Sequence, residues 1–129
     1  MGADMNQCLK AIKEAESYHG PSLIIGYAPC INHGIRTGMQ SAQLEEKKAV
    51  QSGYWNTFRF DPRREEEGQN PFVLDSKAEP TMEYKDFIMN ENRYINLKRQ
   101  NPERAEKLFD KAENDAKKKF AALTKRSLI

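Results

Sequence analysis

The chain has 129 residues, with 21 basic and 19 acidic side chains and a formal net charge of +2. Its length permits one domain with a hydrophobic core, but Leu, Ile, Val and Phe together make up just under a fifth of the residues. At so low a share of apolar residues, the burial of apolar surface hardly offsets the conformational entropy that the chain loses on folding. The small net charge argues against wholesale disorder, so we expect a chain that packs against neighbouring strands that it does not itself supply.

Composition also disfavours several compartments and partners. Two cysteines and no signal-like N-terminus indicate a reducing compartment, for which we expect the cytoplasm, and argue against a disulfide framework. No apolar run approaches the roughly 18 residues that a membrane span needs. Basic residues in the C-terminal part are interleaved with acidic ones, whereas phosphate binding needs an uninterrupted basic face. We therefore expect neither a membrane nor a nucleic acid as a partner.

A first helix is predicted near the N-terminus. Asp4 can cap it, with Gln7 at the third helical position in a variant of the capping box, and the helix should end before Gly20. Apolar side chains recur at helical spacing on one face, namely Met5, Cys8, Leu9, Ile12 and Ala15. Because Cys8 lies inside this stripe, we expect it to be a core residue, not a ligand or a nucleophile.

A buried strand is predicted over residues 22–28, which form an apolar run between Gly20 and Pro29. A continuous run of this kind is typical of a strand covered on both faces, as in parallel sheets. A helix followed by such a strand is half of a right-handed α/β crossover. Cys30 follows the strand almost directly, and α/β proteins place ligands beyond the carboxyl ends of their strands.

Cys30 has three possible interpretations from the residues alone. A lone intracellular cysteine is most often a small buried hydrophobe. A nucleophile paired with His33 would need side-chain contact and a third, orienting group, and the sequence marks no such partner. A metal site needs about four ligands, but the chain has two Cys and two His, so the remaining ligands would lie outside these residues.

The middle of the chain predicts a short helix and two strands. Residues 41–52 favour a weakly amphipathic helix that Gly53 closes. Residues 54–60 alternate aromatic and polar side chains, which suits a strand with one solvated face, and we expect Trp55 to be a packing residue. After a charged connection, residues 72–74 predict a short edge strand.

Two helices are predicted in the C-terminal part. One amphipathic helix carries Phe87, Ile88, Tyr94 and Ile95. Asn101 and Pro102 give the cap and first-turn signals of the second. The apolar face of this second helix is formed by Ala105, Leu108, Phe109, Ala112, Ala116, Phe120 and Leu123. Favourable charge pairs four residues apart lie on its outer side: Glu103–Lys107, Glu113–Lys117 and Asp115–Lys119.

A series of irregular loop motifs in one order gives the sequence a specific family resemblance. The stretch 20–39, GPSLIIGYAPCINHGIRTGM, is followed by KKAV at 47–50, GYW at 53–55 and FRFDP at 58–62. The likeness continues in NPFVLDSK at 70–77 and, more loosely, in FIM at 87–89 and RY at 93–94. Over roughly residues 1 to 115, the sequence resembles the C-terminal part of pyruvate:ferredoxin (flavodoxin) oxidoreductase.

The resemblance implies an activity and its cofactors. Enzymes of this family use thiamine diphosphate and iron–sulfur clusters to cleave pyruvate oxidatively, pass the acetyl group to coenzyme A and reduce ferredoxin or flavodoxin. In the family, the Cys of the Pro-Cys-Ile-Asn loop is the distant fourth thiolate of the [4Fe–4S] cluster nearest the thiamine. Carried over to this sequence, the resemblance implies that Cys30 is that cluster ligand, and that the full enzyme is a homodimer.

Two features of the family are missing from the sequence. The Gly-Asp-Gly motif of the thiamine diphosphate and magnesium site does not occur, nor do the upstream cluster cysteines. We therefore expect a C-terminal piece of the enzyme, inactive in isolation, whose partner is the remainder of the parent enzyme.

The resemblance also implies the fold and the domain organisation. The expected class is α/β, in which residues 1–79 form the closing half of a thiamine-diphosphate-binding domain, with parallel strands flanked by helices. Residues 80–129 are expected to form a helical C-terminal extension. The alternative is a catalytically silent module that docks an electron carrier or a partner subunit.

Overall fold

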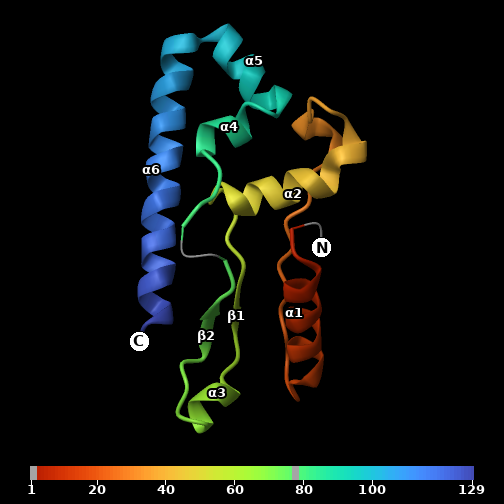
Figure 1. Ribbon diagram of the computed structural model, residues 1–129, viewed down its shortest axis with the longest axis vertical. Helices are drawn as coiled ribbons and strands as arrows, with labels where there is room; N and C mark the ends of the chain where they lie inside the picture. Colours follow the sequence, from red (N-terminus) through yellow and green to blue (C-terminus); the bar gives the residue numbers. More distant parts are fainter. Residues whose placement is uncertain (1–2, 77–78) are drawn as a thin grey trace.

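The computed structural model describes residues 3–76 and 79–129 as a helix-rich chain with one two-stranded antiparallel sheet. The helices and strands are α1 (Met5–Ser17), α2 (Ala42–Gln51), β1 (Phe58–Phe60), α3 (Arg63–Glu66), β2 (Phe72–Leu74), α4 (Tyr84–Ile88), α5 (Asn92–Gln100) and α6 (Pro102–Ser127), with short 3-10 turns at Ile31–His33 and Met39–Ser41. Figure 1 shows α6 along one side, α1 along the other and the strand pair between them. This combination of helices and strands is compatible with the predicted α/β class.

The N-terminal helix α1 begins where the sequence predicts. Asp4 caps it, because Asp4 Oδ1 accepts a hydrogen bond from the Gln7 backbone N–H at 3.0 Å. The apolar face is largely uncovered, with Leu9 48% and Ile12 43% exposed. Cys8 is only partly buried, so the prediction that this stripe belongs to a core is wrong for the described structure. An apolar helix face is buried only where another element offers an apolar surface to it.

Residues 22–28, predicted as a buried parallel strand, belong to no helix or strand in the structure. Leu23, Ile24 and Ile25 are 85%, 57% and 70% exposed. The strand prediction is therefore wrong for this structure. A parallel strand needs a hydrogen-bonded neighbour in the same sheet, and the sheet in the described part of the chain contains only β1 and β2.

The sheet is antiparallel, where parallel strands are predicted. β1 and β2 pair with Phe58 opposite Leu74 and Phe60 opposite Phe72. The predicted edge strand at 72–74 is confirmed. The predicted strand over 54–60 is shortened to its last three residues, because only these face a partner strand.

Polar side chains attach α1 to this strand pair. Arg59 of β1 pairs with Glu14 of α1 and, through Nε at 2.9 Å, with Asp75 Oδ2. Gln7 Nε2 of α1 donates a hydrogen bond to the same Asp75 oxygen at 3.0 Å. The contacts of α1 with the sheet are therefore made through charged and amide groups, while its apolar face stays exposed.

The single helix predicted around Phe87 and Ile95 is two helices, α4 and α5. The break falls at Asn90 and Glu91, whose backbones bond to the loop after Cys30. The Arg36 N–H donates to the Asn90 carbonyl at 3.0 Å, and Ile35 forms an antiparallel bridge with Glu91. Backbone groups used in this way are not available to a continuous helix, so the prediction of one helix is wrong.

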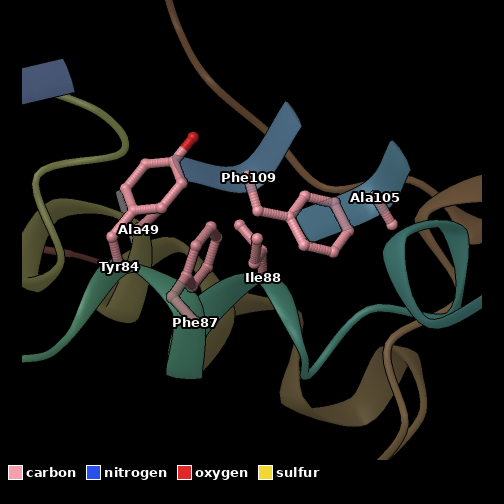
Figure 2. Packing of buried hydrophobic residues seen from close by; sticks show 6 residues of the cluster. All are labelled: Ala49, Tyr84, Phe87, Ile88, Ala105 and Phe109. Carbon is pink, nitrogen blue, oxygen red and sulfur yellow. The ribbon is translucent and has the colours of Figure 1, made fainter. Parts of the chain in front are cut away.

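The core lies where α2, α4 and α6 meet. Figure 2 shows Phe87 and Ile88 of α4 beside Phe109 of α6. The buried cluster consists of Ala49, Tyr84, Phe87, Ile88, Ala105 and Phe109. It draws on residues from both sides of residue 79, and the predicted domain division at that position stays a prediction.

The two remaining helix predictions are confirmed. α2 ends at Gln51, and Gly53 adopts a left-handed conformation with φ 74°. α6 begins with Pro102 in its first turn, and the Asn101 side chain accepts a hydrogen bond from the Arg104 N–H at 3.2 Å. On its outer side, Lys117 pairs with Glu113 at 2.7 Å, as predicted.

Candidate functional site

Cys30 begins a tight, hydrogen-bonded turn with an exposed side chain. The Cys30 backbone N–H donates to His33 Nδ1 at 3.2 Å, and the His33 N–H donates to the Cys30 carbonyl at 3.0 Å. Gly34 ends the turn in a left-handed conformation with φ 63°, and a Cβ there would lie 2.7 Å from Asn92 Cβ. Local hydrogen bonds and one glycine therefore set the shape of the turn. We call residues 29–36 the Cys30 loop.

The Cys30 loop is anchored at both of its ends. Pro29 is buried, and Ile35 is 6% exposed. The Asn92 N–H donates to the Gly34 carbonyl at 2.7 Å, beside the bridge between Ile35 and Glu91. Cys30 is thus a solvent-exposed residue in a loop whose two ends are fixed.

His33 and Cys30 lie together, but not as a nucleophile pair. The Nδ1 atom of His33 accepts the backbone N–H of Cys30, which leaves that nitrogen unable to receive a thiol proton. The His33 ring stacks on Tyr27 at 6.3 Å between ring centroids. Burial lowers the pKa of His33, and the Arg93 guanidinium adds to this, so the neutral ring that accepts a hydrogen bond is favoured.

The described residues do not contain a complete metal site. Within residues 3–76 and 79–129, no group of three or more His, Cys, Asp and Glu side chains could hold a metal ion. Cys8 lies on α1, away from the loop in the chain, and is partly buried. Cys30 could serve only as one ligand of a site whose other ligands lie elsewhere.

Aromatic side chains pack around Tyr27, the residue that stacks on His33 of the Cys30 loop. Tyr27 stacks on Trp55 at 5.4 Å between ring centroids and meets Tyr54 edge-on at 5.9 Å. Lys119 of α6 places its Nζ atom 5.6 Å from the Trp55 ring centroid. The prediction that Trp55 is a packing residue is confirmed, since it packs against the core cluster.

A buried polar cluster that the sequence analysis does not predict lies next to these rings. Glu45 of α2 and Glu91 are 1% and 0% exposed. Asn90 Nδ2 donates to Glu45 Oε2 at 2.6 Å, and Arg93 Nε donates to Glu91 Oε2 at 2.6 Å. Burial raises the pKa of Glu45, and the nearby Glu91 adds to this. The only sequence signal is the polar run at 90–92, which interrupts the predicted helix.

Comparison with known proteins gives the family. No protein-family model matches the chain. A pyruvate:ferredoxin oxidoreductase of Moorella thermoacetica is 58% identical over 117 residues, which cover 91% of this chain and 10% of that protein. This segment belongs to the pyruvate:ferredoxin/flavodoxin oxidoreductase family.

Two further relatives agree with this assignment. A pyruvate-flavodoxin oxidoreductase of Enterobacter agglomerans is 52% identical over 97% of this chain and 11% of its own length. A mitochondrial pyruvate dehydrogenase (NADP+) of Euglena gracilis is 52% identical over 81% of this chain and 6% of its own length. The chain therefore spans about a tenth or less of the length of these oxidoreductases. The helices in the described ranges include none that is long and apolar enough to cross a membrane.

Proposed function

We propose that this chain works as part of a pyruvate:ferredoxin or pyruvate:flavodoxin oxidoreductase. The reaction would be the oxidative decarboxylation of pyruvate to acetyl-coenzyme A, with electrons passed to the carrier protein. The observation that carries the proposal is the 58% identity to the Moorella enzyme over 91% of the chain. The cytoplasm as its location and a homodimer as its assembly remain predictions from sequence.

Cys30 is proposed as one thiolate ligand of a [4Fe–4S] cluster. Such a cluster, when bound by four thiolates, accepts and donates single electrons at a potential that its ligands and surroundings tune. The arrangement of Cys30 fits this role, because its side chain is exposed and its backbone is fixed by His33. The other ligands would come from the remainder of the enzyme, which is the first partner we propose for this chain.

Thiamine diphosphate and its magnesium ion belong to the proposed enzyme, but no residue of this chain is assigned to hold them. The Gly-Asp-Gly motif that would bind the diphosphate is absent from the sequence. Cys8 is likewise given no role in the reaction. The contribution of the chain is thus to carry one cluster ligand and to hold the loop around it.

A catalytically silent docking module is the alternative function, and it is not favoured. The relatives reported above are named as pyruvate oxidoreductases or a pyruvate dehydrogenase. Identity of 50% or more to such proteins, over most of the chain, supports a part in the enzyme.

Two assays test the proposal together. The full-length protein that contains this chain should reduce ferredoxin or flavodoxin when given pyruvate and coenzyme A. The isolated 129-residue chain should neither do so nor bind thiamine diphosphate with magnesium in calorimetry. If the isolated chain bound thiamine diphosphate with a micromolar Kd, about −8 kcal/mol, this would contradict the proposal that the cofactor is held by the remainder of the enzyme. A full-length protein without pyruvate-dependent reduction would contradict the function itself.

A further inference from the structure

Glu45 and Glu91 are two acidic residues in the interior of the structure. Both side chains are essentially withdrawn from solvent, at 1% and 0% exposure. A buried carboxylate is costly unless a cation or hydrogen-bond donors compensate it. Arg93 pairs with Glu91, with Nε 2.6 Å from Oε2, whereas Glu45 accepts its hydrogen bond from the neutral amide of Asn90.

Each glutamate has one satisfied oxygen and one that is not. The Oε2 atoms accept hydrogen bonds from Asn90 and Arg93. The Oε1 atoms of both residues are buried and find no donor among the described residues. Asn90, the residue before Glu91, donates to Glu45, and burial together with the charge of Glu91 raises the pKa of Glu45, so the two carboxyl groups are neighbours. Two deprotonated carboxylate oxygens are both acceptors and cannot hydrogen-bond to each other. One proton shared between the two carboxyl groups would give each of them a hydrogen-bond partner.

We propose that Glu45 and Glu91 share one proton, and that this acid–carboxylate hydrogen bond fastens the Cys30 loop to α2. The proton resides on Glu45, because Arg93 stabilises the negative charge on Glu91. The pKa of Glu45 is raised by its burial and by the charge of Glu91, which is in keeping with this assignment.

The other charged and titratable groups around the pair do not supply the missing donor. Lys48 of α2 favours the charged form of Glu45 through its electrostatic field alone. His33 and Tyr27 feel the charge of Glu45 from the loop side. The Tyr27 hydroxyl is itself buried and has no partner in the described structure, and the Tyr54 hydroxyl accepts from Arg93 at 3.1 Å.

The pair connects α2 to the loop through the backbone around Glu91. Glu91 bridges to Ile35, and the flanking residues make two further bonds, from Arg36 N–H to the Asn90 carbonyl and from Asn92 N–H to the Gly34 carbonyl. The segment just after Cys30 thus rests on residues 90–92, and the shared proton ties these residues to Glu45. The shared proton does not depend on the proposed function, but its value for holding a cluster ligand does.

The sign of the pH dependence follows from the raised pKa of Glu45. A group whose pKa is raised in the closed state gives its full stabilisation below the ordinary glutamate pKa, and loses it as the pH rises through the raised value. Opening of the loop should become about tenfold more frequent per pH unit inside that window and then level off.

Hydrogen–deuterium exchange of the full-length protein measures this opening in a peptide that covers residues 30–38. Glu45→Gln is the matched variant, because its amide oxygen can accept from Asn90 and its N–H can donate to Glu91, while the amide does not titrate. Wild type and Glu45→Gln are compared at equal pH, so that the intrinsic pH dependence of exchange cancels. The exposed Glu66→Gln of α3 serves as the control. We expect the ratio of wild-type to Glu45→Gln exchange to rise with pH in this peptide, and the Glu66→Gln ratio to stay flat.

Infrared difference spectra of wild type minus Glu45→Gln give a second, independent measurement. We expect the carbonyl band of a protonated carboxyl group to persist in wild type above the ordinary glutamate pKa, and Glu91→Gln to remove or shift it. A flat exchange ratio together with no such band would overturn the proposal, as would loop protection that depends on added magnesium or potassium. Because neither measurement needs pyruvate turnover, failure here is distinguishable from failure of the proposed enzyme function.

Discussion

Replacing Phe109 by Ala should be among the most damaging single changes to the core. The side chain is 4% exposed, and its ring meets that of Tyr94 edge-on at 6.0 Å between centroids. Truncation of a buried Phe to Ala costs about 3–5 kcal/mol, since it removes apolar burial and leaves a cavity. With a urea slope of about 2 kcal/mol per molar, the midpoint of unfolding should fall by about 2 M.

Equilibrium urea unfolding followed by Trp55 fluorescence measures this shift, because Trp55 packs against the same core. Leu108→Ala is the matched control on the same helix. Leu108 is 43% exposed, so its truncation should cost only about 1 kcal/mol. Equal midpoints for the two variants would refute the packing of α6 through Phe109 described above.

Two further variants test the attachment of α1 and the role of His33. Arg59→Met removes the ion pairs to Glu14 and Asp75, so amide exchange within α1 should accelerate while exchange in α6 is unchanged; no acceleration relative to Lys10→Met would mean that these polar contacts do not hold α1. His33→Gln in the full-length enzyme should keep most of the activity, because His33 accepts a backbone N–H and meets no reacting group in the described structure; a loss of about a hundredfold or more, the scale of a general acid or base, would show that it transfers a proton.

Local signals predict where α1 and α6 begin and where α2 ends. The caps at Asp4 and Asn101 and the stop at Gly53 depend on atoms within a few residues of each other. Residues close to one another in the sequence are therefore enough to predict these three helix ends. The predicted edge strand at 72–74 was found for a similar reason, since its ends are marked by local composition.

Local signals do not predict contacts between segments that are far apart in the sequence. The apolar run at 22–28 indicates that a neighbour is needed, but not that this chain supplies one. The break between α4 and α5 arises from backbone bonds to Gly34 and Arg36, and hydrophobic periodicity does not register such bonds. The pairing of Glu45 with Glu91 escaped prediction in the same way, because each looks like an ordinary helix-surface residue in sequence.

The central claim is that Cys30 is a ligand of an iron–sulfur cluster, and one measurement tests it most directly. Full-length enzyme carrying Cys30→Ala should be reduced and examined by electron paramagnetic resonance alongside an iron count. Loss of one thiolate should remove or convert one cluster and leave the others intact, while Cys8→Ala should leave every cluster signal in place. An unchanged spectrum, with about four irons retained per cluster, would contradict the claim and make Cys30 an ordinary surface residue.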